Sequence, residues 1–291
     1  MHTLIILVVV GFVAQLIDGA LGMAYGVSST TLLLAAGISP AAASASVHFA
    51  EIATTAASGA AHWRFGNVDW RVVRTMAIPG FVGAFAGAVL LTSLSAEVAK
   101  PFMAIILTGL GVVVLLRFAF GTTARARQRR TVARIFLAPL GLFGGFMDAA
   151  GGGGWGPIGT PTLLASGRME PRKVVGSIDT SEFLVALGAS AGFLIALGSS
   201  ELSWAWVGAL VAGGLAAAPL AAWLVRRLAP RVLGTSVGGL IILTNAKTLG
   251  EATGLPAPQL IAIYAAVTAV WVAAIVIAVR AERRAAGLAV A

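Results

Sequence analysis

The chain has 291 residues, of which 58% are hydrophobic and only 11% are charged, and it carries a formal net charge of +9 without any cysteine. Soluble globular domains contain about 45–50% apolar and about 25% charged residues, so this composition excludes an ordinary soluble domain. The lack of cysteine excludes a disulfide framework and any metal site built on thiolates.

The apolar residues gather in stretches of about 20, the length that a helix needs to cross about 30 Å of hydrocarbon. Inside a bilayer only helices and closed barrels satisfy the backbone, and barrel strands would alternate apolar and polar residues. Met103–Leu116 and Ile261–Val279 are apolar without such alternation. The fold class is therefore predicted to be all-α, a polytopic helical membrane protein.

Two pairs of short apolar arms stand among the longer spans. In chain order we expect arms at 4–20 and 27–37, spans at 41–62, 75–94 and 101–118, arms at 135–150 and 157–167, and spans at 174–198, 203–225, 232–249 and 259–279. Glycines interrupt each pair, at Gly19–Gly26 and at Gly151–Gly156. An arm of 11 residues is about 16 Å long, about half of a bilayer. Each pair therefore predicts a re-entrant hairpin that enters and leaves the membrane on the same side.

The positive charges agree with these hairpins. If both hairpins return to their own side, every Lys and Arg except Lys100 and Lys247 falls on one face, in the loops Arg64–Arg74, Arg117–Arg134, Arg168–Lys173, Arg226–Arg231 and Arg280–Arg284. The positive-inside rule then predicts a multi-pass protein of the inner (plasma) membrane, with the C-terminus in the cytoplasm and the N-terminus outside. The rule accounts for the net charge without nucleic acid as a partner.

The two halves of the chain resemble each other at an offset of 148 − 18 = 130 residues. The aligned pairs are Asp18 with Asp148, Gly26 with Gly156 and, one inserted residue later, Ser46 with Ser177 and Glu51 with Glu182. We expect a first repeat at 1–120, a basic loop at 121–134, a second repeat at 135–254, and an extra helix with a basic tail at 255–291. The predicted hairpins approach from opposite sides, so the repeats are inverted, which points to a transporter with its site near the midplane. The alternative is that the glycines reflect only close helix packing.

The hairpin tips are the predicted binding site. The second arm of each hairpin begins at the tip, so its free N–H groups and positive dipole end would lie in the middle of the membrane. Two such ends facing each other form an anion site without any buried Arg or Lys. Ser28 and Ser29 are expected to cap the first of these arms, and Pro157 suits the first position of the other. The candidate substrate-binding residues are Gly22, Tyr25, Gly26, Ser28, Ser29, Ser46, Gly152, Gly153, Trp155, Gly156, Thr160 and Ser177. The alternative is that the hydroxyl groups only cap helices.

Ionisable residues inside apolar spans are costly, and they indicate function by default. The candidates for proton coupling are Asp18, His48, Glu51, Asp148, Asp179 and Glu182. Carboxylates do not bind anions unless they are protonated, which suggests a transporter coupled to protons. His48 lies one turn before Glu51, where Asp179 lies before Glu182. The alternative is that the two glutamates are structural and form hydrogen bonds across helices.

No motif for chemistry on a substrate is present. The chain has no G-x-x-x-x-G-K-[ST] sequence, which would bind a nucleotide, and its three histidines lack metal-ligand spacing. We therefore predict no enzyme activity, no catalytic residue, no metal and no cofactor.

Three segments carry a resemblance to a known family: the glycine-rich tip Asp148–Gly156, the segment Pro40–Ser46, and the loop Gly66-Asn-Val-Asp-Trp70 followed by Arg71. With the duplicated architecture, they make nearly the whole chain resemble the TauE/SafE family of sulfite exporters and related permeases. The resemblance implies transport of sulfite, thiosulfate, sulfonates or sulfoacetate-like anions by a secondary mechanism. The first tip, Gly19–Gly26, lacks the glycine run of the family, which leaves the exact substrate open.

Three functions follow from these observations. The first is a secondary transporter of a small sulfur-containing anion such as sulfite, thiosulfate or an organosulfonate, coupled to protons, with an alternating-access site at the midplane. The second is an anion-selective channel that uses the same site. The third is a membrane assembly subunit or enzyme without transport. The partners are the anion and the lipid bilayer, and the sequence leaves a homodimer open.

Overall fold

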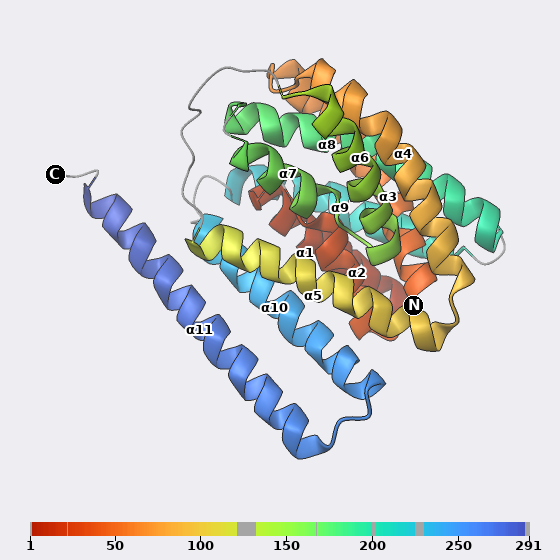
Figure 1. Cartoon of the computed structure of the whole chain (residues 1–291), viewed down its shortest axis with the longest axis vertical. Helices are drawn as coiled ribbons and strands as arrows, with labels where there is room; N and C mark the ends of the chain where they lie inside the picture. Colours follow the sequence, from red (N-terminus) through yellow and green to blue (C-terminus); the bar gives the residue numbers. More distant parts are fainter. Residues whose placement is uncertain are drawn as a thin grey trace.

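The computed structural model describes residues 2–21, 23–120, 132–166, 168–198, 202–224 and 230–288, and every regular element in these ranges is an α-helix (Figure 1). The helices are α1 (His2–Leu21), α2 (Tyr25–Ala35), α3 (Pro40–Arg64), α4 (Trp70–Ser93), α5 (Ala96–Phe120), α6 (Arg134–Gly151), α7 (Trp155–Ala165), α8 (Pro171–Leu197), α9 (Trp204–Leu224), α10 (Pro230–Ala252) and α11 (Ala257–Leu288). The all-α prediction is confirmed, and each predicted segment corresponds to one helix.

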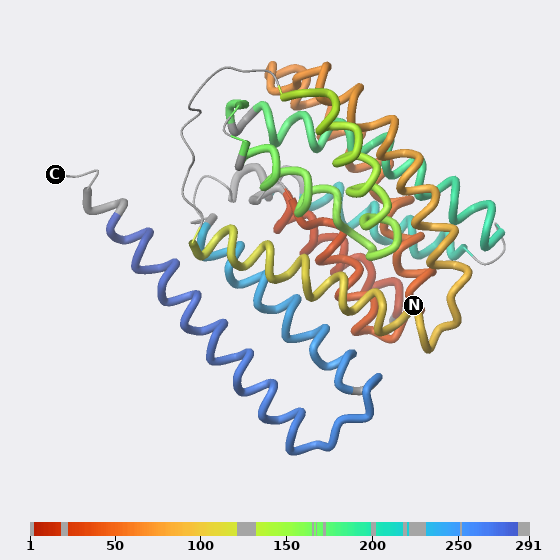
Figure 2. Tube along the Cα trace, viewed as in Figure 1, coloured from red at the N-terminus to blue at the C-terminus, as the bar shows by residue number. Residues whose placement is uncertain are grey.

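Five helices of the described ranges are long and apolar enough to cross a membrane, namely α4, α5, α8, α10 and α11. The apolar part of α11 is only 6% buried, whereas that of the other four is 39–50% buried. Helix α11 lies at the edge of the molecule beside α10 (Figures 1 and 2). An apolar helix that is exposed along most of its length fits a surface covered by lipid.

Each helix from α1 to α5 has a counterpart five positions later, so that α1 corresponds to α6 and α5 to α10. The contacts between helices follow this correspondence. Helix α4 packs on α6 just as α9 packs on α1, and α4 packs on α8 just as α9 packs on α3. In addition, α5 packs on its own counterpart α10, and α3 packs on its own counterpart α8. The duplication found in the sequence thus has a counterpart in the packing. Insertion of the two halves from opposite sides of the membrane stays a prediction, as do the proposed domain boundaries.

Glycines allow close approach of the helices at the α4–α6 interface and at the corresponding α1–α9 interface. A methyl group added to Gly145 of α6 would overlap the backbone of Gly80 in α4, and one added to Gly213 of α9 would overlap the backbone of Val8 in α1. Small residues at such positions let membrane helices pack backbone to backbone. These two glycines therefore serve close packing between helices.

The paired arms have unequal lengths. Helices α2 and α7 have 11 residues each, whereas α1 has 20 and α6 has 18. At 1.5 Å per residue, the second arms are about half a bilayer long and the first arms are about 27–30 Å long. The short second arms match the predicted hairpins, but length alone does not make the first arms re-entrant, and the hairpins remain a prediction.

The predicted helix cap at Ser28 and Ser29 is wrong. Helix α2 begins at Tyr25, so both serines lie inside the helix, and Ala24 stands at the N-cap with a left-handed φ of 102°. The cap is replaced by a carboxylate from the preceding helix, because Oδ1 of Asp18 accepts a hydrogen bond from the N–H of Tyr25. In the other hairpin α7 begins at Trp155, two residues before the predicted start at Pro157.

Two of the predicted basic loops lie at the same end of the bundle. The ammonium group of Lys173 donates a hydrogen bond to the carbonyl of Val68 at 3.1 Å, and the N–H of Asp69 donates to Oγ of Ser177 at 2.8 Å. Asp69 also caps α4 by accepting from the N–H of Arg71. The loops at 64–74 and 168–173 therefore share one face, as the charge pattern predicts. Residues 121–131 of the basic loop at 121–134 lie outside the described residues.

Candidate functional site

The starts of the two short helices lie against each other in the centre of the molecule. A methyl group added to Gly26 in the first turn of α2 would lie 2.8 Å from Cα of Gly153, just before α7. Conversely, one added to Gly156 in α7 would lie 3.1 Å from Cβ of Met23, just before α2. These two contacts are equivalent in the repeat, because Gly26 corresponds to Gly156 and Met23 corresponds to Gly153 at the offset of 130 residues. The hydroxyl of Thr30 also donates a hydrogen bond to the carbonyl of Gly152 across the contact.

A carboxylate caps each of the two helix starts. In the second hairpin, Oδ1 of Asp148 accepts hydrogen bonds from the N–H of Gly154 at 2.6 Å and from the N–H of Trp155 at 3.0 Å. In the first hairpin, Oδ1 of Asp18 accepts from the N–H of Tyr25 at 3.2 Å. Each aspartate stands seven residues before the first residue of the helix that it caps. Negative oxygen at these positions is stabilised by the free N–H groups and by the positive end of the helix dipole.

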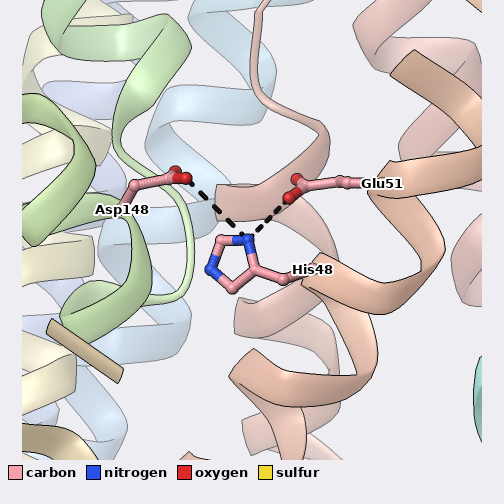
Figure 3. Close-up of side chains that lie close together, drawn as sticks. All are labelled: His48, Glu51 and Asp148. Carbon is pink, nitrogen blue, oxygen red and sulfur yellow. Dashed lines mark hydrogen bonds and ion pairs between the residues drawn. The ribbon is translucent and has the colours of Figure 1, made fainter. Parts of the chain in front are cut away.

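His48 connects the cap of α7 to the carboxylate of Glu51 (Figure 3). Nδ1 of His48 lies 2.8 Å from Oε2 of Glu51, at hydrogen-bond distance, and 3.8 Å from Oδ2 of Asp148. All three side chains are buried, with at most 1% of each exposed. All three are among the six candidates for proton coupling from the sequence, and the fold brings Asp148 to Glu51 across 97 residues of the chain.

Acidic side chains from three helices converge on a small cavity. The cavity has room for about one water molecule. Its lining residues are Gln15, Asp18, Tyr25, Glu51, Thr54, Thr55, Ser58, Asp179 and Glu182. Four of the predicted proton-coupling residues therefore meet at one place. The hydroxyl of Ser58 donates to both carboxylate oxygens of Asp179, at 2.9 and 2.8 Å. This lining contains no Lys, Arg or His.

Sequence reasoning missed four polar residues of the cavity lining, Gln15, Thr54, Thr55 and Ser58. A signal for them was present. Thr54, Thr55 and Ser58 follow Glu51 at spacings of three, four and seven residues, so they share its face of α3. Gln15 precedes Asp18 by three residues on α1 in the same way. A search for polar residues on the same helix face as each intramembrane acid would have found all four.

The predicted substrate-binding residues separate into two groups. Tyr25 lines the acidic cavity, and Gly26, Gly152, Gly153 and Gly156 form the contact between the helix starts. Ser28, Ser29 and Thr160 are buried within the first six residues of α2 and α7, and Ser46 is buried in α3. Gly22 lies outside the described residues.

Trp155 and Ser177 point elsewhere. Nε1 of Trp155 donates hydrogen bonds to the carbonyl of Ile178 at 3.0 Å and to Oγ of Ser181 at 3.2 Å, and its ring packs on Gly80 of α4. Its indole therefore fixes α7 to α4 and α8. The hydroxyl of Ser177 is engaged by the backbone of Asp69 at the loop end of the bundle. Neither side chain lines the cavity.

One group among the described residues has ligand atoms close enough for a metal ion, namely His48, Glu51 and Asp148, whose candidate atoms lie within 4.8 Å of one another. However, Nδ1 of His48 is at hydrogen-bond distance from the glutamate. The arrangement fits an imidazole held between two carboxylates.

Comparison with known proteins places the chain among membrane transporters. The family model of the sulfite exporter TauE/SafE family matches residues 7–248. A curated relative, the "Probable membrane transporter protein YtnM" of Bacillus subtilis (strain 168), is 51% identical over 276 residues, which cover 94% of this chain and 92% of the relative. No solved structure matches the chain. The matched region contains α2–α9, including both helix starts and the acidic cavity.

Proposed function

Since the chain belongs to the TauE/SafE family of membrane transporters, we propose that it moves a small sulfur-containing anion such as sulfite, thiosulfate or an organosulfonate across the inner (plasma) membrane. The site of the anion is the contact between the starts of α2 and α7, near the midplane. The anion reaches this site from each side in turn, by alternating access.

The observation that carries this proposal is the meeting of two helix N-termini at Gly26 and Gly153. Helix N-termini bind anions through backbone N–H groups and a favourable dipole, without a cationic side chain. No Lys or Arg lines the adjoining cavity, so the anion is held by amide and hydroxyl groups. The hydroxyls of Ser28 and Thr160 are buried and have no hydrogen-bond partner among the described residues, which leaves them available as donors.

The capping aspartates suggest that a substrate anion can replace a carboxylate at the N–H groups of each helix start. Asp148 already directs an anionic oxygen at two N–H groups, so this helix start accommodates such an oxygen. A sulfite or sulfonate oxygen has the same requirement for N–H donors. We propose that the substrate competes with Asp148 at α7 and with Asp18 at α2 for the N–H groups of the helix starts.

Proton coupling follows from the crowding of like charges. Asp18, Glu51, Asp179 and Glu182 all line one small cavity, and His48 and Asp148 adjoin it through Glu51. An anion brought close to ionised carboxylates in a medium of low dielectric is strongly repelled. Protons taken up by these groups together with the anion remove the repulsion, so the two are transported together.

The orientation is proposed from charge. The basic loops at 64–74 and 168–173 meet at one end of the bundle, and the positive-inside rule assigns that end to the cytoplasm. On this reading the N-terminus lies outside and the C-terminus inside.

An uptake assay in proteoliposomes tests the proposed function. The purified protein is reconstituted, and the uptake of labelled sulfite, thiosulfate and a sulfonate is measured with and without a pH gradient. We expect saturable uptake of at least one anion, increased by a gradient that drives protons in the same direction. No flux of any of the three anions above that of protein-free liposomes would contradict the proposal. Flux that does not saturate and that drives no proton movement would favour an anion channel.

A further inference from the structure

The two halves of the chain carry corresponding groups of three ionisable residues, one with a base and one without. The first group, Asp148–His48–Glu51, corresponds to Asp18–Asp179–Glu182 at offsets of 130 residues for the first member and 131 for the other two. In each group the first residue caps a short helix, and the other two lie one turn apart on a long helix, α3 or α8. Where the first group has His48, the second has Asp179.

In the first group a side chain of the protein, His48, can supply a positive charge. His48 contacts carboxylate oxygens of both Glu51 and Asp148 from 2.8 and 3.8 Å. Protonated on both nitrogens, its imidazole is a cation that balances these buried acids. No separate ion is needed there.

The second group has no such cation. Asp18, Asp179 and Glu182 all line the acidic cavity, and their polar contacts among the described residues are with neutral donors, the N–H of Tyr25 and the hydroxyl of Ser58. The three side chains are half-buried, and carboxylates held together away from bulk water without a positive charge are unfavourable unless they are neutralised. The second group thus lacks the charge that His48 provides in the first.

Two further lining residues carry buried oxygen atoms. Oε1 of Glu51 has no hydrogen-bond partner within the part of the chain that the structure describes, and Oη of Tyr25 interacts with the hydroxyl of Ser29. The residues of both line the cavity, and only 1% of Glu51 and 5% of Tyr25 is exposed. Nearly all polar atoms that the lining residues can offer are carboxyl or hydroxyl oxygens. Oxygen-rich surroundings suit a proton or a hard cation such as Na⁺.

We propose that this cavity binds the exchangeable monovalent cation, a proton or a sodium ion, at Asp18, Asp179 and Glu182 with help from Glu51. In the other group the imidazole of His48 takes the place of that cation, and it does not exchange because it is part of the chain. The inference deepens the proposed transport function, because it assigns the coupling ion to one of the two groups. The asymmetry between His48 and Asp179 decides which group exchanges its cation.

No Lys, Arg or His of the described residues lines the cavity. Ionisable groups that face it come from α1 (Asp18), α2 (Tyr25), α3 (His48, through Glu51), α6 (Asp148, through His48) and α8 (Asp179 and Glu182). Helix α9 also packs on α1 and α3, and its residues Trp204–Leu224 include no ionisable side chain. Helix α10 packs on α1 and α2 and carries Arg231 and Lys247, neither of which lines the cavity. Among the groups that face the cavity, His48 is the one base.

Cation binding is measured on the purified full-length protein in detergent, without any sulfur anion. The thermal unfolding midpoint is recorded in NaCl and in choline chloride of equal ionic strength over a series of pH values. A ligand that binds only the folded state raises this midpoint. A saturable rise of several degrees specific to Na⁺ identifies sodium. A dependence on pH alone that is lost in Asp179→Asn identifies the proton.

Three variants test the assignment. Asp179→His puts a fixed base in the second group, so it should lose the cation response, and Glu182→Gln should weaken it if the histidine variant does not fold. Glu97→Gln changes an exposed acid at the start of α5 and should respond like the natural protein. The proposal is overturned if the natural protein responds to neither ion, or if both cavity variants keep its full response. Because no anion is present, failure here is separate from failure to transport sulfur anions.

Discussion

Gly26 and Gly153 meet backbone to backbone, so that a single added methyl group on Gly26 would come within 2.8 Å of Cα of its partner. This contact joins the start of α2 in one half of the chain to the loop before α7 in the other. It brings the amide ends of two short helices together, with the side chain of Glu51 beside Gly26.

A methyl group at this contact should damage both folding and transport. Gly153 has φ of +139°, in the region that favours glycine, and a Cβ there would overlap Gly26 and Val27. We expect Gly153→Ala to destabilise the protein by about 1–3 kcal/mol, the usual cost of a strained backbone, and to abolish anion uptake. Thermal unfolding and proteoliposome uptake measure the two effects. Gly109→Ala in α5 is the control, because a Cβ there meets no atom within 4 Å. If both variants behave alike, the tip contact is not needed.

Asp148 should act as a helix cap through its oxygen and as a charge through its ionisation. Asp148→Ala leaves the N–H groups of Gly154 and Trp155 without their partner, so it should cost about 1–3 kcal/mol of stability. Asp148→Asn keeps an oxygen acceptor and should lose much less. Thermal unfolding of the two variants separates the roles, and equal losses would show that the oxygen is not the cap.

Neutralising the buried glutamates should remove the effect of a pH gradient. Glu51→Gln and Glu182→Gln keep the shape of the side chain but cannot release a proton, so uptake should no longer respond to the gradient. Binding of the anion should remain detectable, because the helix starts are intact. Proteoliposome uptake with and without the gradient is the measurement, with Glu97→Gln as the matched control. Unchanged coupling in both glutamate variants would remove these residues from the proton path.

The topology can be tested with single cysteines, because the natural chain has none. Phe65 and Arg168 are exposed in two loops at one end of the bundle, and Ser95 is exposed between α4 and α5. Cysteine at either of the first two positions should react with an impermeant thiol reagent only from the cytoplasmic side, and cysteine at Ser95 only from outside. Labelling in intact cells and in inside-out vesicles decides this. Reaction of the first two positions from opposite sides would exclude the predicted hairpins.

The sequence was sufficient for the helices because apolar length and glycine breaks are local signals. It placed the two short arms within two residues of the observed starts at Tyr25 and Trp155. The caps could not be read from local rules, because those rules place the capping side chain next to the helix that it caps. Here Asp18 and Asp148 reach back from the preceding helix, seven residues away, and only the repeated spacing in the two halves could have indicated it.

The candidate site was predictable in kind and only partly in detail. The six ionisable residues were singled out because charges inside apolar spans are costly, and they do converge. The direction of a side chain depends on packing between distant segments, which sequence spacing does not give. Trp155 therefore could not be assigned to the α4–α8 side, nor Ser177 to the loop at Asp69.

The most direct test of the central claim is to locate a bound anion. Selenite resembles sulfite, and selenium scatters X-rays anomalously, so a crystal of the natural protein soaked in selenite reveals where such an anion binds. We expect an anomalous peak within hydrogen-bond distance of the backbone N–H groups at the start of α2 or α7, beside Gly26 and Gly153. A peak at any other place in the protein, in crystals that show none at these helix starts, would contradict the account.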